Sequence, residues 1–277
     1  MTTTEKPEIG QSAEANGIRT NYLEAGKGDE TVLLIHGSGP GVTSYANWRL
    51  VIPALAEDFH VFAPDMVGFG YSDRPEGIEY GLDTWANQTV GLMDALGIRQ
   101  AHLVGNSFGG AIALRIAAQH PERVGKLVLM GSMGVSFPIT EGLERVWGYE
   151  ASFESMRKVL DVFAYSRELV NDELAQVRYE GSIQPGFQEA FSAMFPAPRQ
   201  RWVEAMATPE EQIRALPHRT FIVHGREDKV IPVSNSYQLE GLIDNADLAV
   251  FSHCGHWSMI ERTADFNRLV RDFLLSE

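Results

Sequence analysis

Short apolar runs alternate with helical patterns along most of this chain, and few folds can accommodate that order. Each run is apolar without interruption and ends at a Gly, Asp or His turn. Unbroken runs of this length are typical of strands that a parallel sheet buries on both faces. The runs that we expect to form strands cover residues 31–37, 60–65, 101–107, 126–131, 219–225 and 246–253.

Helical periodicity fills the stretches between these runs. A strand, a helix and a second parallel strand form a right-handed βαβ unit, and a series of such units builds a doubly wound sheet. The 277 residues suffice to bury a large core. The sequence therefore predicts an α/β fold with a mostly parallel, doubly wound sheet and with helices over 48–57, 83–97, 109–121 and 264–275.

The alternation stops between residues 134 and 208. This stretch contains helical pieces and several prolines but little strand signal, and the strand pattern resumes at Arg219. Ligands bind at the carboxyl ends of the strands in a doubly wound sheet, where an insertion can cover them. We expect residues 1–133 and 209–277 to form the core and residues 134–208 to form a helical lid.

The formal net charge of −14 narrows the range of partners. Nucleic-acid binding needs clustered Lys and Arg, and an anionic substrate would need a local cation of its own. Cys254 is the single cysteine, so no disulfide can form within the chain. Residues 1–10 lack the apolar region of a signal peptide, and no apolar run is long enough to span a bilayer. We expect a cytoplasmic protein that binds neither nucleic acid nor membrane.

The motif Gly105-Asn106-Ser107-Phe108-Gly109 lies between an expected strand and an expected helix. In that context the G-x-S-x-G pattern is typical of a nucleophile elbow, in which a sharp turn exposes the serine hydroxyl. The alternative is an ordinary turn in which Ser107 caps the helix that follows. The context favours a nucleophilic serine.

A serine hydroxyl is a weak nucleophile that needs a base, and a third group must orient that base. On this kind of sheet the chain order is serine, acid, histidine. Asp228 follows the strand 219–225 and His256 follows the strand 246–253, so both can reach the edge that carries Ser107. We therefore expect these three residues to form a catalytic triad.

Neighbouring residues offer alternatives to the expected acid and base. Glu227 could serve as the acid and His253 as the base, although loop position favours the expected pair. His36 and His224 stand at strand ends, where a structural or pocket-lining role is the simpler interpretation. Cys254 is interpreted as a small buried residue rather than as a nucleophile.

The glycine-rich stretch 36–41 follows the first expected strand. A tetrahedral oxyanion needs preorganised N–H donors, and we assign one to Phe108 and a second to Ser38. A dinucleotide fingerprint would need glycine where Val42 stands, and the Lys-Ser/Thr ending of a phosphate-binding loop is missing. No His or Cys spacing suggests a metal.

Together these stretches resemble the α/β-hydrolases, and more narrowly the meta-cleavage product hydrolases of bacterial aromatic degradation, which hydrolyse a carbon–carbon bond. The resemblance covers essentially the whole chain and is greatest to the 2-hydroxymuconate-semialdehyde hydrolases. The residues that carry it are HGSGPG, the Asn47-Trp48 pair, APDMVGFGYSDRP, VGNSFGGAIAL, GREDKVIP and CGHW.

The resemblance implies a dienoate substrate, with a carboxylate at one end and a ketone or aldehyde at the other. It assigns the carboxylate to an arginine of the lid, and Arg178 stands where that arginine falls. A guanidinium fork suits a carboxylate, and the acidic chain makes a local cation more necessary. The resemblance implies no cofactor and no metal, and it implies a homo-oligomer. The expected substrate-binding residues are Gly37, Ser38, Gly39, Asn47, Asn106, Arg178 and Trp257.

The expected reaction is hydrolysis of a 2-hydroxy-6-oxo-dienoate, such as 2-hydroxymuconic semialdehyde or its 6-alkyl derivatives. The products are 2-hydroxypenta-2,4-dienoate and a small carboxylic acid. Ketonisation with help from His256 comes first, and Ser107 or an activated water then attacks the distal carbonyl. Alternatives are a 6-phenyl substrate, a carboxylesterase or lactonase on the same fold, and a ligand receptor without activity. Arg178 could also be a surface residue, and Trp257 an ordinary core residue.

Overall fold

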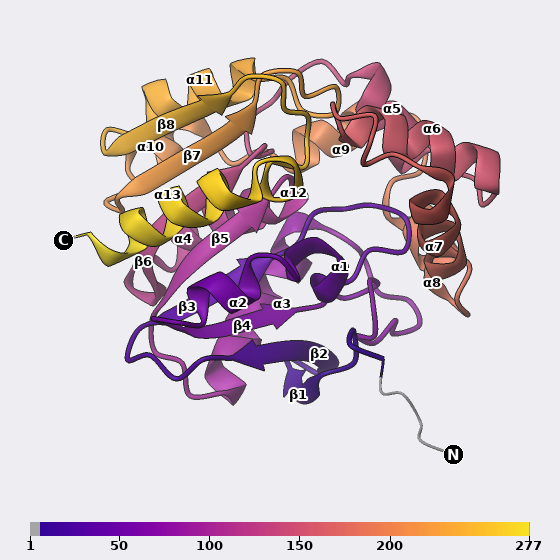
Figure 1. The fold of residues 1–277 in the computed structure, drawn as a ribbon. Helices are drawn as coiled ribbons and strands as arrows, with labels where there is room; N and C mark the ends of the chain where they lie inside the picture. Colours follow the sequence, from indigo (N-terminus) through magenta and orange to yellow (C-terminus); the bar gives the residue numbers. More distant parts are fainter. Residues whose placement is uncertain (1–5, 277) are drawn as a thin grey trace.

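The computed structural model describes residues 6–276, and residues 1–5 and 277 lie outside it. The expectation for the N-terminal ten residues therefore rests partly on residues outside the described ones. Within the described range the strands form one sheet of eight, in the order β1-β2-β4-β3-β5-β6-β7-β8 (Figure 1). The strands are β1 (Gln11–Ala15), β2 (Ile18–Ala25), β3 (Thr31–Ile35), β4 (His60–Pro64), β5 (Ala101–Asn106), β6 (Val124–Met130), β7 (Thr220–Gly225) and β8 (Ala246–Phe251).

The six strands expected from the apolar runs are confirmed as β3 to β8, and all of them pair in parallel. The hairpin of β1 and β2 was not expected, and it pairs antiparallel to β4. Its turn is Asn16-Gly17, with φ of 51° and 76° at the two residues. Positive φ at both central residues is the geometry that Asn-Gly turns favour in two-residue hairpins. That dipeptide was the available signal.

The expectation that every apolar run is buried on both faces is wrong for β8. This strand forms one edge of the sheet, and all six of its residues are partly or fully exposed. An edge strand has a neighbour on one side only, so an apolar run does not by itself place a strand in the centre. β5 shows the expected pattern, because each of its residues is buried.

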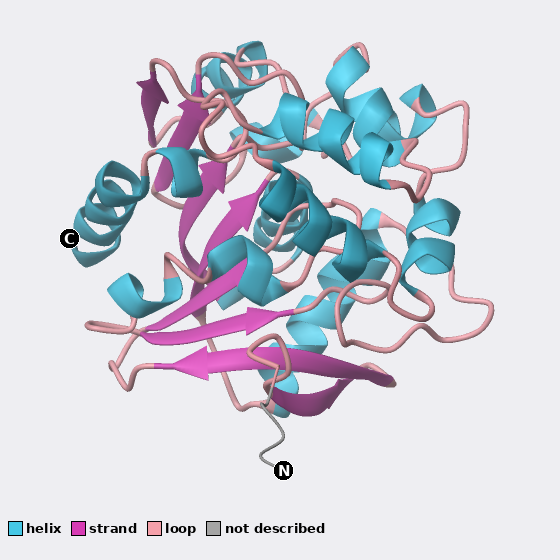
Figure 2. Cartoon of the chain, turned by 45° about the vertical axis from the view of Figure 1, so that its right-hand side comes forward, coloured by secondary structure: helices cyan, strands magenta, loops and turns pink. Residues whose placement is uncertain are grey.

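Helices cover both faces of the sheet (Figure 2). Adjacent residues of β5 show this directly, because Leu103 belongs to one apolar cluster with Trp85 and Val104 belongs to another with Phe266. Both faces of the central strands are therefore sealed from water, as a parallel sheet requires. The helices that pack on the sheet or connect its strands are α1 (Ser44–Trp48), α2 (Ile52–Leu55), α3 (Leu82–Ala95), α4 (Phe108–Gln119), α11 (Ser234–Leu242), α12 (Ser258–Glu261) and α13 (Thr263–Leu275).

The expectation of one helix over residues 48–57 is wrong, since that stretch is divided between α1 and α2. Pro53 lies in the first turn of α2. Proline lacks the N–H that a helix interior needs but is tolerated in a first turn, so the chain begins a new helix there. Within residues 6–276 no helix has the length and apolar character needed to cross a membrane.

The stretch between β6 and β7 is helical, and we call residues 134–208 the inserted segment. Its helices gather beside the sheet at the right of Figure 1. Several of them begin at a polar residue whose side chain accepts the N–H three residues on: Thr140 for α5, Ser152 for α6 and Asn171 for α7. The helices are α5 (Glu141–Trp147), α6 (Phe153–Phe163), α7 (Asp172–Ser182), α8 (Phe187–Met194) and α9 (Gln200–Ala205), and α10 (Glu210–Arg214) follows before β7.

Candidate active site

Ser107 occupies the sharp turn between β5 and α4. Its backbone lies at φ 55° and ψ −112°, outside the regions that non-glycine residues ordinarily adopt. The turn is held by hydrogen bonds: Ser107 N–H donates to the carbonyl of Met130 at 2.8 Å, and the Ser107 carbonyl accepts from Gly110 at 3.0 Å and Met133 at 3.1 Å. Within the described residues its hydroxyl makes no capping bond to α4. Backbone strain that is fixed in this way is typical of functional sites.

The glycines on either side of Ser107 allow the turn to be this tight. A Cβ atom at Gly105 would collide with the carbonyl oxygen of Gly109, and one at Gly109 would collide with the carbonyl oxygen of Ile35. Neither glycine has positive φ. The motif therefore needs glycine for close backbone approach, and the unusual dihedral angles fall on the serine itself.

Asp228 and His256 meet at the carboxyl ends of β7 and β8. Nδ1 of His256 lies 2.6 Å from Oδ2 of Asp228, and both side chains are buried. The other carboxylate oxygen accepts the N–H groups of Val230 at 2.7 Å and Ile231 at 3.0 Å. Because the carboxylate can only accept, the proton of a neutral His256 lies on Nδ1, which leaves Nε2 as the basic atom.

The charge on Asp228 is strongly favoured. Burial by itself raises its pKa, but the attraction of His256 and the hydrogen bonds from His224 and His256 outweigh burial. The result is a pKa well below the ordinary value of 3.8. An ionised acid that points at Nδ1 is what a triad requires for orientation and for stabilising the imidazolium.

Gly131 connects this pair to the serine. Its predecessor accepts the Ser107 N–H, and a Cβ atom built on Gly131 would lie 3.3 Å from Asp228 Oδ2 and 3.3 Å from the His256 ring. The turn at Ser107, the carboxylate of Asp228 and the imidazole of His256 therefore all lie close to the backbone of Gly131. The turn at Ser107 and the Asp228–His256 pair thus lie close to each other, and their action as one triad stays a prediction.

The alternative acid and base point elsewhere. Glu227 accepts the N–H of Cys254 at 3.0 Å and pairs with Arg226 at 3.0 Å. The ring of His253 lies against Tyr165, with 5.6 Å between the ring centres. The thiol of Cys254 is buried, and burial raises its pKa to about 12, so it is held as the neutral thiol. These three residues take no part in the cluster around Asp228.

Phe163, at the end of α6, holds the loop that carries His256. Its carbonyl accepts the N–H groups of His256 at 2.8 Å and Trp257 at 3.2 Å, and its ring stacks on the indole of Trp257 at 4.8 Å. Gly255 allows the approach, because a Cβ atom there would lie 2.8 Å from the backbone of Tyr165. The sequence analysis missed Phe163, since an aromatic residue in a helical pattern carries no signal of this contact.

The glycine-rich loop after β3 is tied to the elbow. Oδ1 of Asn47 accepts the N–H of Gly37 at 3.1 Å and the amide of Asn106 at 3.0 Å. In addition, the indole N–H of Trp147 on α5 donates to the hydroxyl of Ser38 at 3.0 Å. Asn47 and Asn106, two predicted substrate-binding residues, therefore bond to each other. The glycine-rich loop is held by Asn47 through Gly37 and by Trp147 through Ser38.

Phe108 and Gly39 also lie at this loop and elbow. Phe108 is the first residue of α4, a position whose N–H has no acceptor within its own helix. Gly39 faces the inserted segment, where its Cβ position would lie 3.6 Å from the ring of Phe163. Phe108 thus adjoins Ser107 in the elbow, whereas Gly39 lies where the loop faces the inserted segment, and the oxyanion role of Ser38 and Phe108 stays a prediction.

A buried carboxylate beneath this loop was missed by the sequence analysis. Asp65, directly after β4, accepts the N–H of Ser44 at 2.7 Å, the N–H of Tyr71 at 2.8 Å and the side-chain amide of Asn21 at 2.8 Å. It thus joins the start of α1, the loop 66–73 and β2. An aspartate that ends a buried strand was the available signal, but no motif rule assigns it a partner.

Arg178 projects from α7 toward the same loop. Its Nη2 donates to the carbonyl of Pro40 over a long 3.4 Å, and within residues 6–276 its buried Nε has no hydrogen-bond partner. Burial, followed by repulsion from Arg49, lowers its pKa to about 10, and Tyr149 acts in the opposite direction. At neutral pH it is a half-buried cation, and the nearby charge that most affects its pKa is the cation of Arg49. Such a group requires an anion, because an uncompensated buried charge is costly.

A cavity of about 460 Å³ lies between α1, α7 and α12, and Arg178 lines it. Much of its wall is apolar, contributed by Leu174, Phe187 and Ile260 among others. Its charged lining residues are of both signs, Glu8 and Glu168 as well as Arg49 and Arg178, and apolar walls with a few charged groups suit a small organic molecule. The predicted site residues on this wall are Asn47, Arg178 and Trp257, and Arg49 joins them.

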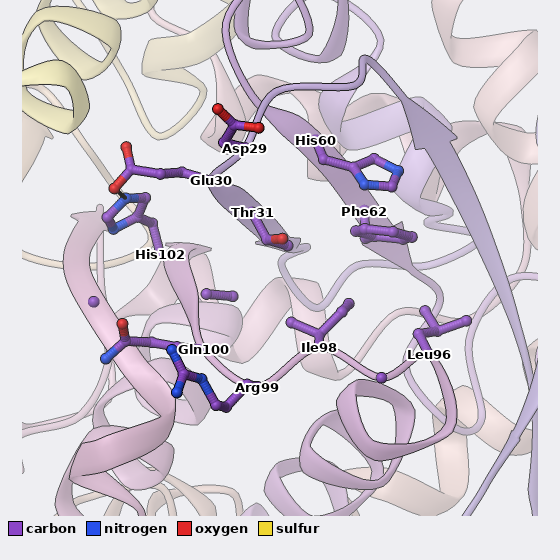
Figure 3. A pocket seen from close by; sticks show the side chains of 13 residues that line it. Asp29, Glu30, Thr31, His60, Phe62, Leu96, Ile98, Arg99, Gln100 and His102 are labelled. Carbon is purple, nitrogen blue, oxygen red and sulfur yellow. Dashed lines mark ion pairs between the residues drawn. The ribbon is translucent and has the colours of Figure 1, made fainter.

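A second hollow lies at the opposite edge of the sheet, at the amino ends of β3, β4 and β5 (Figure 3). Glu30 and His102 form an ion pair there at 3.6 Å, and Arg99 and Gln100 come from the loop before β5. Ser107, at the carboxyl end of β5, is a full strand length away. Of the two hollows, the cavity beside α7 is the one that candidate site residues line, namely Asn47, Arg178 and Trp257, whereas Ser107 and His256 are not part of its lining.

Comparisons with known proteins agree with this geometry. A family model described as alpha/beta hydrolase fold matches residues 30–263. The 2-hydroxymuconate semialdehyde hydrolase of a Pseudomonas species is 60% identical over 268 residues, which span 97% of this chain and 94% of that protein. The chain belongs to the meta-cleavage product hydrolases of the α/β-hydrolase fold.

Other meta-cleavage product hydrolases resemble the chain over comparable lengths. The 2-hydroxy-6-oxo-2,4-heptadienoate hydrolase of Pseudomonas putida is 55% identical over 98% of both chains. Among solved structures, a serine-to-alanine variant of the meta-cleavage product hydrolase of Pseudomonas fluorescens, complexed with acetates, has a TM-score of 0.96. It is 58% identical and covers 97% of this chain and 98% of its own. The fold and the family predicted from the sequence are thus confirmed.

Proposed function

We propose that this chain hydrolyses the carbon–carbon bond of a 2-hydroxy-6-oxo-dienoate that carries hydrogen or a small alkyl group at position 6. The products would be 2-hydroxypenta-2,4-dienoate and a small carboxylic acid. The observation that carries the proposal is the half-buried Arg178 beside an apolar cavity, whose buried Nε has no hydrogen-bond partner within residues 6–276. The names of the relatives support it, since two of them act on 2-hydroxymuconate semialdehyde and on a 6-methyl homologue.

Substrate placement follows from the charges. The dienoate carboxylate pairs with the guanidinium of Arg178, which offers two parallel N–H groups in a fixed plane. The net charge of −14 repels an anion at long range, so this local cation has to supply the attraction. The apolar wall accepts the diene, and the distal carbonyl extends toward Ser107.

The proposed chemistry begins with ketonisation of the dienol, for which His256 moves the proton. The ketone is an electron sink, so the carbon–carbon bond can break with its electron pair entering a dienol. Ser107, or a water activated by His256, attacks the distal carbonyl, and on the serine route a water then hydrolyses the acyl group on Ser107 to release the acid. The oxyanion accepts the N–H groups of Ser38 and Phe108, where preorganised donors commonly contribute several kcal/mol, about 2.7–4 for one donor in a known case.

In this proposal residues 134–208 act as a lid. Trp147 bonds to Ser38, Phe163 bonds to His256, and Arg178 bonds to Pro40, so three helices of the inserted segment each contact one part of the site. Closure over the substrate excludes water and strengthens the pairing of Arg178 with the carboxylate. No cofactor takes part in the proposed steps.

We also propose a cytoplasmic homo-oligomer, on the strength of the family resemblance alone. Light scattering behind a size-exclusion column measures the mass of the particle in solution. A mass at or above twice 30.7 kDa supports the proposal, and the mass of a single chain contradicts it.

The test of the activity is product formation from 2-hydroxymuconic semialdehyde and from its 6-methyl and 6-phenyl derivatives. Loss of the yellow dienolate absorption gives the rate, and mass spectrometry identifies the dienoate and the acid. We expect the highest kcat/KM for the hydrogen or methyl substrate. A preference for the phenyl substrate would contradict the proposed size class, and turnover of neutral esters without any turnover of dienoates would contradict the function.

The matched control is Ser107→Ala. This variant keeps Arg178 and the cavity, so it should still bind the dienoate and perturb its absorption spectrum without releasing an acid. Acid quenching during the first turnover of the unaltered enzyme detects any acyl group on Ser107. Its presence supports direct attack by the serine, and its absence supports attack by water.

A further inference from the structure

His224 is a buried histidine that contacts the catalytic acid. It is the second-last residue of β7, and its side chain is fully shielded from solvent. Nε2 lies 3.1 Å from Oδ2 of Asp228 and 3.0 Å from the carbonyl of Ile231. Nδ1 lies 2.6 Å from the hydroxyl of Ser236 on α11. The same carboxylate oxygen therefore faces two imidazoles, those of His224 and His256.

The contacts of His224 fix where its proton lies. A carboxylate and a backbone carbonyl both accept hydrogen bonds, so Nε2 must be protonated. The hydroxyl of Ser236 can donate to Nδ1, which allows the ring to remain neutral with a satisfied lone pair. Ser236 thus selects the Nε2–H form, just as Asp228 selects the Nδ1–H form of His256.

We propose that His224 is a positioning residue for catalysis: its Nε2–H bonds to the carbonyl of Ile231 and also faces Oδ2 of Asp228 at 3.1 Å, where it limits how strongly that oxygen attracts the Nδ1 proton of His256. The inference rests on the triad role that the proposed function gives to Asp228 and His256. An oxygen that accepts from two donors divides its negative charge between them, because each hydrogen bond withdraws electron density from it. His256 consequently returns to its neutral, basic form more readily.

Within the described residues, charged groups also lie beside this cluster. The carboxylates of Glu227 and Glu261 accept the N–H groups of Cys254 and Gly255, which precede His256 in the same loop. The other two groups that contact His224 are the carbonyl of Ile231 in the loop and the hydroxyl of Ser236 on α11, and neither of them titrates. On the neighbouring strand β8 the register partner of His224 is the apolar Val250.

The test compares three variants after circular dichroism has established folding. His224→Phe fills the space without a donor, His224→Gln places an amide N–H near the position of Nε2, and Ser236→Ala removes the group that selects the tautomer. The first measurement is the pH dependence of kcat. We expect the acidic limb of the Phe variant to move to higher pH by about half a unit or more, with an intermediate shift for Ser236→Ala and a restored limb for Gln.

The second measurement needs no turnover. The Nδ1 proton of His256 in its short bond to Asp228 gives a low-field proton resonance, which should move further downfield in the Phe variant because Oδ2 then serves one donor. This readout separates failure of the inference from failure of the proposed function. An unmoved resonance together with an unmoved acidic limb would reduce His224 to a packing residue. If His224→Phe does not fold, the acidic limb and the low-field resonance are compared between Ser236→Ala and His224→Gln instead.

Discussion

The catalytic half of the site and its substrate-binding half are built differently. Asp228 accepts two backbone N–H groups and faces two imidazoles, and the backbone of Ser107 makes three hydrogen bonds within its turn. Arg178 makes one long bond to Pro40, and its buried Nε makes none within the described part of the chain. In the proposed function, the groups assigned to the chemistry are thus held by several hydrogen bonds, whereas Arg178, the group assigned to substrate selection, is held by one long bond.

This difference follows from what each half must do. A catalytic group gains from rigidity, because preorganised donors and bases need no rearrangement in the transition state. A residue that selects substrate is more selective when the protein itself supplies no partner for it. A ligand without the matching charge then leaves the cation unpaired and binds less well. The predictions below test the two halves separately.

The largest effect should come from removing the nucleophile or the base. We expect Ser107→Ala and His256→Ala each to lower kcat by roughly 10⁴-fold or more, because triad members act as a unit. Turnover of a dienoate and of p-nitrophenyl acetate should fall together, since both reactions use the same groups. Near-normal turnover of either substrate by Ser107→Ala would show that the elbow is not the reaction centre.

Replacing the acid should have the next largest effect. Asp228→Asn presents an amide N–H or an oxygen to His256 and no charge, so we expect kcat to fall by about 10³- to 10⁴-fold. Glu227→Gln is the matched control, because it alters the neighbouring carboxylate, which faces Cys254 and Arg226. The assignment of the acid would be off by one residue if the control lost activity and Asp228→Asn kept it.

The support beneath the loop should affect stability more than chemistry. Asp65 accepts three N–H groups, and Asn at this position would turn a donor toward one of them. We expect Asp65→Asn to lower the free energy of unfolding by about 1–3 kcal/mol, measured by urea titration. The KM and kcat of the protein that remains folded should change little. An unchanged urea midpoint would contradict the role given to Asp65.

The smallest effect should come from the single cysteine. Folding raises the pKa of Cys254 from 9.0 to about 12, so this group favours the fold below pH 9 and that contribution is lost as the pH rises toward 12. At about pH 8 we expect iodoacetamide to label the native chain far more slowly than the urea-unfolded chain. Cys254→Ala should retain kcat within about twofold. Fast labelling that abolishes activity would place this thiol in the site.

Most of the predicted catalytic residues could be identified from the sequence, because short local patterns specify them. The glycines Gly105 and Gly109 on either side of Ser107 specify a sharp turn. The predicted acid and histidine each follow a predicted strand, which places both at the same edge of the sheet. Contacts between distant segments have no such signature. The carbonyl of Phe163 on the His256 loop, and the contact between His224 and Asp228, both depend on how loops pack in three dimensions.

The fold shows the same division. Unbroken apolar runs predicted the six parallel strands, but an apolar run cannot tell an edge strand such as β8 from a central one. The expected helix 48–57 is divided near Pro53, because proline is tolerated in the first turn of a helix but not in its interior. Hydrophobic periodicity alone does not reveal this. Arg178 was found through the family resemblance, and its long bond and unpaired Nε could come only from the structure.

The role of Arg178 in substrate selection is measured by the ratio of kcat/KM for a dienoate to that for p-nitrophenyl acetate, in Arg178→Ala and in the unaltered enzyme. The ester has no carboxylate, so its hydrolysis should change little. Arg201→Ala, which removes an exposed arginine of the same inserted segment, controls for the loss of one charge.

We predict that the ratio falls about tenfold or more in Arg178→Ala, which corresponds to about 1.4 kcal/mol or more of lost transition-state stabilisation confined to the dienoate. The Arg201 control should keep the ratio of the unaltered enzyme. An equal loss on both substrates, or no loss on either, would contradict the claim that Arg178 is left incomplete for a substrate carboxylate.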